Sequence, residues 1–226
     1  MLMKQELYML YKNYQIDFKN VKNLFPNDDL RGPFLISPNL KYANQVARLL
    51  IIGQETKGWK SEIDDIEKQM KEYEDFNLGE KYYSSPYYNV TRKIEAKLGN
   101  EQYSNTQTNI NKFDVGGKHP NGKHEIAISS LDKILIDEIK ILKPQICIFF
   151  IGHKFDCRLS KIFLDIQFNE VAGFNKMEFC QLKSSLLPEL SFRAYHPGYL
   201  RRSGKEKKFL NFIDNLSTCT NNTSIK

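Results

Sequence analysis

The sequence predicts an α/β protein, folded as a three-layer α/β/α sandwich around a central, mostly parallel four- to five-stranded sheet. Two observations favour this class. Segments with helical spacing of apolar residues alternate with short strand-like segments along the chain, as in βαβ units. Residues 47–52 and 145–151 are also too short and too uniformly apolar to be surface helices, so we expect strands that are covered on both faces.

Residues 1–40 are expected to form an N-terminal helical segment and a loop. Apolar residues recur with loose helical spacing over residues 5–24, and a Pro-Asn-Asp turn ends the pattern. After the first strand, a charged helix is expected over residues 61–74. An aromatic loop at residues 82–88 then precedes a helix over residues 90–98.

The second half of the chain continues the alternation. Residues 106–113 read as a strand with polar alternation, and the glycine-rich loop 116–122 follows it. A helix is expected over residues 131–142, because two serines that can cap it precede this segment and a proline follows it. The last elements are two strands, a terminal helix and a polar tail that we expect to fray: residues 179–182, 191–195, 204–216 and 218–226.

Length and composition are those of an ordinary globular protein. The 226 residues suffice for one large core, so we expect a single domain over residues 1–226. No run approaches the roughly 20 apolar residues of a membrane span, and the N-terminus lacks the apolar core of a signal peptide. We therefore expect a cytoplasmic monomer with no membrane partner. The four cysteines form no Cys-x-x-Cys pair, which argues against zinc or iron–sulfur sites, and we expect no cofactor or metal.

The net charge is +6, a moderate excess that suits a polyanionic partner. Five basic residues cluster near the C-terminus: Arg201, Arg202, Lys205, Lys207 and Lys208. One interpretation is a nucleic-acid-binding patch, and the alternative is the solvated start of a helix.

Two predicted strands end in polar turns. Residues 49–52 run into Gly53-Gln54-Glu55-Thr56, and residues 191–195 run into His196-Pro197-Gly198-Tyr199-Leu200. In an open parallel sheet, ligands bind at the carboxyl ends of the strands. The sequence therefore predicts a carboxylate and an imidazole at one edge of the sheet, and this combination suggests a catalytic site.

These turns resemble two motifs of the uracil-DNA glycosylase superfamily. The turn at Gly53 is similar to its water-activating turn, which reads Gly-Gln-Asp-Pro-Tyr in the best-known family, and the turn at His196 is similar to its His-Pro-Ser-Pro-Leu motif. Residues 142–152 are similar to the superfamily's lysine-proline, strand and glycine segment. The resemblance spans about residues 48–202 and implies a monofunctional DNA glycosylase, which removes uracil or a related damaged base flipped out of single- or double-stranded DNA.

The resemblance also implies roles for the two turns. Glu55 would orient water or stabilise the cation-like sugar, and His196 would donate to a carbonyl oxygen of the departing base. Gln54 would line the pocket. Asn109, with Asn111 as the second choice, falls where the superfamily keeps an asparagine that reads the pyrimidine edge.

Three further residues would contact DNA. Leu200 corresponds to a leucine that wedges into the duplex, and Arg201 and Arg202 would contact the flanking phosphates. None of these roles needs a metal.

The chain departs from the motifs at several positions. Glu55 replaces an aspartate, Gly198-Tyr199 replaces Ser-Pro, and the tyrosine that excludes thymine has no counterpart unless Trp59 fills that wall. A second hypothesis is therefore a superfamily member with altered catalysis that acts as a nucleic-acid-binding or nucleotide-sensing module.

Structural alternatives stay open for the individual residues. Glu55 would then cap the next helix, His196 would be a satisfied turn histidine, and the two asparagines would satisfy backbone groups. We assign no role to the remaining histidines, which are expected on the surface or in loops: His119, His124 and His153.

Overall fold

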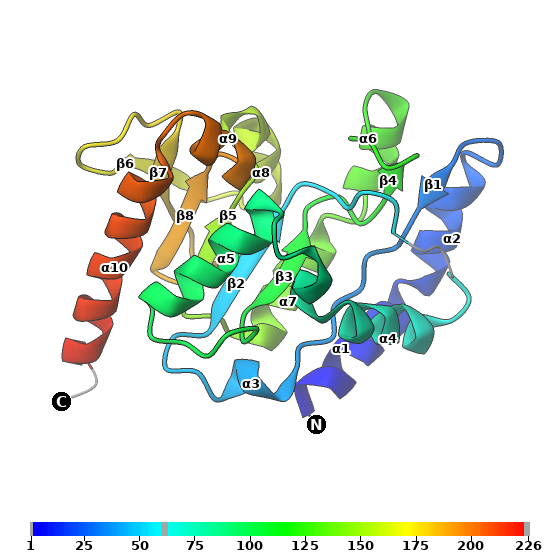
Figure 1. Ribbon diagram of the computed structural model, residues 1–226. Coiled ribbons are helices and arrows are strands. Elements are labelled where there is room, and N and C mark those ends of the chain that lie inside the picture. Colours follow the sequence, from blue (N-terminus) through cyan, green and yellow to red (C-terminus); the bar gives the residue numbers. More distant parts are fainter. Residues whose placement is uncertain (1, 60–62, 224–226) are drawn as a thin grey trace. The chain divides into compact units, whose positions relative to one another are not determined.

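The structure is a computed structural model that describes residues 2–59 and 63–223 (Figure 1). The chain divides into two compact units, which we describe separately. Unit 1 contains Met1–Pro38, Ile52–Phe76 and Gln107–Lys143, and unit 2 contains Asn39–Ile51, Asn77–Thr106 and Pro144–Lys226. The single domain expected from the sequence stays a prediction.

The described residues form one six-stranded sheet with the strand order β3-β2-β5-β8-β7-β6. The sheet is mostly parallel and flanked by helices, so the predicted α/β fold is confirmed. β5 and β8 pair in parallel, whereas β7 runs antiparallel to both of its neighbours. The strand bounds are β2 Leu49–Gly53, β3 Thr106–Asn109, β5 Ile146–Phe149, β6 Gln167–Glu170, β7 Phe179–Lys183 and β8 Leu190–Ala194.

The sequence predicted four to five strands for the central sheet, and the strand of this sheet that it missed is β6. Its sequence, Gln-Phe-Asn-Glu, lies at the sheet edge and is only partly buried. A strand that pairs along one side and faces solvent needs few apolar residues, so its sequence carries little of the pattern that marks a central strand.

Unit 1 has more helices than the N-terminal pattern suggested. The predicted segment 5–24 is two helices that meet at Tyr14. The predicted helix 61–74 begins at Ile66, and residues 60–62 lie outside the described part of the chain. The bounds in this unit are α1 Leu2–Asn13, α2 Gln15–Asn23, β1 Leu30–Arg31, α4 Ile66–Phe76, β4 Asp114–Val115, α6 Lys123–Ser129 and α7 Lys133–Leu142; β1 and β4 pair antiparallel.

A buried polar network holds the centre of unit 1. Glu138 of α7 is fully buried, and its carboxylate lies 2.7 Å from the ammonium of Lys112. The same carboxylate accepts hydrogen bonds from Tyr11 of α1 at 2.8 Å and from Thr108 of β3 at 2.7 Å. Burial lowers the pKa of Lys112 while Glu138 opposes that shift, and burial raises the pKa of Tyr11. The network joins three elements, α1, β3 and α7, and includes Lys112, the residue that follows Asn111 in the chain.

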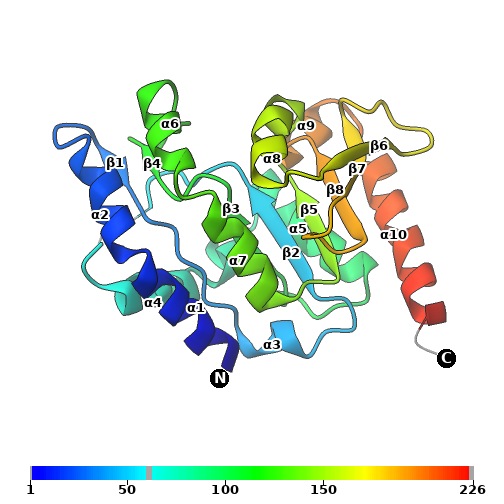
Figure 2. The same ribbon diagram turned by 180° about the vertical axis from the view of Figure 1, so that it is seen from behind.

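Unit 2 carries its helices on both faces of its strands. α5 and α10 lie on one face (Figure 1), and α8 lies on the other (Figure 2). The bounds are α3 Leu40–Ala43, η1 Asn77–Tyr82, α5 Pro86–Lys97, η2 His153–Phe155, α8 Asp156–Ile162, α9 Pro197–Arg202 and α10 Glu206–Thr223. The terminal helix continues through residues 218–223, past the end that the sequence predicted at residue 216. Residues 224–226 lie outside the described part.

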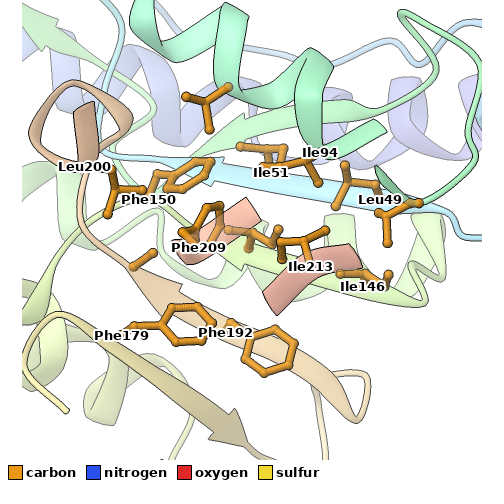
Figure 3. Close-up of a cluster of buried hydrophobic side chains, with 14 of the residues drawn as sticks. Leu49, Ile51, Ile94, Ile146, Phe150, Phe179, Phe192, Leu200, Phe209 and Ile213 are labelled. Atoms are coloured by element: carbon orange, nitrogen blue, oxygen red, sulfur yellow. The ribbon is translucent and has the colours of Figure 1, made fainter. Parts of the chain in front are cut away.

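The core of unit 2 lies between its strands and the helices α5 and α10 (Figure 3). Phe209 and Ile213 of α10 are buried there, and their spacing of four residues places them on one face of the helix. Full burial of each such side chain contributes about 1.5–3 kcal/mol. Among the helices that the structure describes, none is both long and apolar enough to pass through a membrane.

Candidate functional site

The turn after β2 is fixed to the chain that leaves β3. The carbonyl of Gly53 accepts the backbone N–H of Ile110 at 3.0 Å, and the carbonyl of Gln54 accepts that of Asn111 at 2.8 Å. The strand that the sequence predicted over residues 106–113 ends at Asn109 in the structure. The two hydrogen bonds of Ile110 and Asn111 extend the contact with the turn beyond the end of the strand. Glu55, the next residue, is therefore held at the carboxyl end of β2.

The Glu55 carboxylate contacts two polar side chains of unit 1. Its Oε2 atom lies 2.7 Å from Nδ1 of His119 and 3.3 Å from the amide nitrogen of Asn111. An ionised carboxylate can only accept, so Nδ1 of His119 carries the proton of this hydrogen bond. Neither partner is a helix N–H group, and α4 begins only at Ile66. Glu55 therefore does not cap a helix.

Asp114 clamps the two loops that carry this pair. It is fully buried, and its Oδ2 atom accepts hydrogen bonds from the Thr56 hydroxyl at 2.6 Å and from the backbone N–H of Gly58 at 2.8 Å. A longer bond of 3.3 Å comes from the N–H of Trp59. Its Oδ1 atom accepts the N–H of Gly117 at 2.7 Å. The turn after Glu55 and the turn before His119 are thus bound to one carboxylate.

The two asparagines differ in what they contact. Asn111 is buried and donates to Glu55. Asn109, at the end of β3, is 8% exposed, and the described part of the chain provides no hydrogen-bond partner for its side-chain amide. A nearly buried amide without a protein partner retains its donor and acceptor for a ligand. The Gln54 side chain is half-buried.

Trp59 packs inside unit 1. Its ring lies edge-on to Phe34 at 4.7 Å and to Phe76 at 5.6 Å between centroids, and its indole N–H donates to Gln69 at 3.2 Å. These contacts bind the end of the turn to α4. They give Trp59 a packing role.

In unit 2, His196 follows β8 and begins α9. Its Nδ1 atom accepts the backbone N–H of Gly198 at 3.1 Å, so it caps the helix as a turn histidine would. The ring stacks on Tyr87, with centroids 5.6 Å apart and planes at 26°. Because Nδ1 accepts, the proton of the neutral ring is on Nε2. His196 as a whole residue is exposed.

The placement of Leu200 requires a correction. Its side chain is 4% exposed and packs in the core of unit 2 with Phe150 and Phe209 (Figure 3). α9 turns this residue inward because it packs against α5 and α10. A side chain that fills the core is not presented to a DNA duplex in this conformation. The exposed neighbour is Tyr199, at 37%.

The two arginines of α9 are also unlike. Arg201 donates to Glu206 at 2.8 Å and to Asn89 at 2.5 Å. Arg202 is exposed, and no described residue forms an ion pair with it. Of the two, Arg202 is the one whose charge is open to a phosphate.

A second polar cluster lies where β5 and β8 end. The Tyr195 hydroxyl lies 3.0 Å from Nδ1 of His153, and Nε of the buried Arg193 lies 3.0 Å from Asp156. Burial raises the pKa of Asp156, although the Arg193 charge opposes the shift. Arg193 also donates to the carbonyl of Met177 at 2.7 Å, so the cluster ties together the segments around β8.

Comparison with known proteins adds no family. A scan of the chain against protein-family models found no match, and a search of curated proteins also found none. Within the described residues, no three or more His, Cys, Asp or Glu side chains come together in an arrangement that would hold a metal ion.

Sequence reasoning missed His119 and Asp114. His119 has no role in the sequence interpretation because it stands in a glycine-rich loop 64 positions from Glu55. The signal that points to it is its place shortly after β3, the strand that ends at Asn109 and lies next to β2 in the sheet. A loop that leaves a neighbouring strand at the same edge can bring its side chains to the same turn.

Proposed function

We propose that the protein is a DNA glycosylase-like hydrolase that cleaves the N-glycosidic bond of uracil or a related damaged base flipped out of DNA. The observation that carries the proposal is the state of Glu55. Its carboxylate stands at the carboxyl end of β2, mostly buried, and is oriented by His119 and Asn111. A negative charge held in this way is what a cation-like sugar requires as its base departs.

His196 supports the same chemistry from the turn after β8. Because Nδ1 accepts the N–H of Gly198, the neutral ring carries its proton on Nε2, and this N–H is the donor that we propose for the leaving base. An oriented N–H stabilises the charge that develops on a carbonyl oxygen of the leaving base without full proton transfer. Stacking on Tyr87 holds the plane of the ring.

Recognition of base and backbone is proposed for other groups. The Asn109 amide offers one donor and one acceptor, which match a uracil-like edge. Arg202, with the exposed Lys207 nearby in sequence, would neutralise phosphates of the strand. We further propose that the protein acts on DNA as a cytoplasmic monomer, as expected from the sequence, and that it serves base repair.

A substrate panel tests the proposal. Oligonucleotides that carry uracil, hypoxanthine or an oxidised pyrimidine, single- and double-stranded, are incubated with excess enzyme. Free base is measured by mass spectrometry, and abasic sites are measured by alkaline strand cleavage. We expect free uracil and an equal yield of abasic sites. Release of no base from any substrate would overturn the proposal and favour a binding module with altered catalysis.

A further inference from the structure

The Glu55–His119 pair is asymmetric in its exposure. The Glu55 side chain is 14% exposed, whereas that of His119 is 43% exposed. The carboxylate is therefore the enclosed member of the pair and the imidazole the member that meets solvent. Of the two groups, the imidazole is therefore the more accessible to a water molecule.

The hydrogen bond between them also selects the form of the imidazole. Because Nδ1–H donates to Glu55 Oε2, the acceptor nitrogen of the neutral ring is Nε2. A buried carboxylate behind a histidine holds the ring in one tautomer and stabilises the imidazolium once it forms. His196 has the opposite arrangement, since its Nδ1 accepts and its Nε2 carries the proton.

Asp114 fixes the position of the loop that carries His119 within unit 1. Two successive glycines before it have positive φ values, +57° at Gly116 and +74° at Gly117. Residues other than glycine rarely adopt such values. The N–H of Gly117 is bound to the same carboxylate that binds Thr56 and Gly58. The loop that carries His119 is therefore held to the turn that carries Glu55.

We propose that His119 is the group that takes the proton of the attacking water, with Glu55 as its partner; this inference rests on the proposed glycosylase function. The water oxygen forms a bond to C1′ of the deoxyribose as the C1′–N bond breaks. The water proton passes to Nε2 of His119, and the electron pair of the broken bond leaves with the base. The imidazolium that results stands against the Glu55 carboxylate, which neutralises its charge.

The alternative is that Glu55 takes the proton itself and His119 only orients it. Two substitutions separate these possibilities. In His119→Asn, the side-chain amide can still donate to Glu55 but has no basic nitrogen. In His119→Ala, both are lost, but the space left can admit imidazole from the buffer. His124→Ala is the matched control, because His124 lies in the same unit and pairs with Asp28 instead.

The test measures single-turnover base release by the full chain and by these variants, with folding checked by thermal melting. We expect both His119 variants to lose about a hundredfold or more in rate, added imidazole to restore part of the rate of His119→Ala, and His124→Ala to match wild type. Wild-type rates in His119→Asn would overturn the role of His119 and leave the glycosylase function standing. A wild-type chain that releases no base would overturn both.

An activity-independent readout is the tautomer of His119, read from its ¹⁵N chemical shifts by NMR in wild type and in Glu55→Gln. We expect the Nδ1–H form in wild type. A wild-type ring protonated only at Nε2 would contradict the proposal whatever the enzyme assay gives.

Discussion

Nδ1 of His119 lies 2.7 Å from Oε2 of Glu55, which joins a loop histidine to the acid of the turn after β2. The longer glutamate side chain, which departs from the aspartate of the motif it resembles, is the one whose carboxylate meets this imidazole. At the position where the chain departs from the motif, the carboxylate thus has a histidine partner in the same unit.

Leu200→Ala should destabilise the protein. The side chain lies in the core of unit 2, so its loss should lower the free energy of unfolding by about 2–5 kcal/mol. Denaturant unfolding measures this. Tyr199→Ala, at the exposed neighbouring position, is the control and should cost less. If Leu200→Ala kept full stability and lost only activity on duplex DNA, the leucine would be a wedge after all.

Uracil in a single strand should be released faster than uracil in a duplex. Because Leu200 lies in the core, its side chain does not fill the gap that a flipped base leaves, and extrusion from a paired helix costs a few kcal/mol. Single-turnover rates on matched single- and double-stranded oligonucleotides measure the difference, which we expect to be about tenfold or more. Equal or faster release from the duplex would mean that another side chain acts as the wedge.

Arg202→Ala should weaken DNA binding more than Arg201→Ala. Arg201 is occupied by Glu206 and Asn89, whereas Arg202 has no ion-pair partner among the described residues. The slope of log K against log salt on single-stranded DNA should fall by about 0.7 for Arg202→Ala. Lys183→Ala is the control, because Lys183 ends β7, which runs against β8, and so lies at the opposite sheet edge from α9. An unchanged slope for Arg202→Ala would remove it from the interface.

Glu138→Gln should destabilise the protein strongly. It leaves the buried ammonium of Lys112 without its counter-charge, a change that costs about 3–5 kcal/mol. Asp137→Asn, on the same helix, breaks a more exposed pair with Lys140 and should cost at most about 1 kcal/mol. The two unfolding free energies make the comparison. Equal effects would mean that the buried Lys112 ammonium does not depend on the charge of Glu138.

The fold was predictable where burial leaves a pattern in the sequence. The apolar segments that became β2 and β5, and the helical spacing of Phe209 and Ile213, are direct consequences of a core. The edge strand β6 was not predicted, because a strand at a sheet edge needs few apolar side chains. The ends of the predicted buried strands also placed the turns that carry Glu55 and His196.

The side-chain partners were not predictable. The contact of His119 with Glu55 depends on the Asp114 clamp, and a contact between residues 64 positions apart leaves no periodic signal. The inward direction of Leu200 depends likewise on how α9 packs against α5 and α10. Motif spacing places residues on a turn but does not decide which way each side chain faces.

The most direct measurement is the single-turnover release of uracil from a single-stranded oligonucleotide by wild type, Glu55→Gln and His196→Ala. Glu67→Gln, an exposed glutamate on α4, and His124→Ala serve as matched controls. We expect wild type and both controls to release uracil, and the two site variants to be slower by about a hundredfold or more. Release at the wild-type rate by Glu55→Gln and His196→Ala would contradict the assignment of these residues to catalysis.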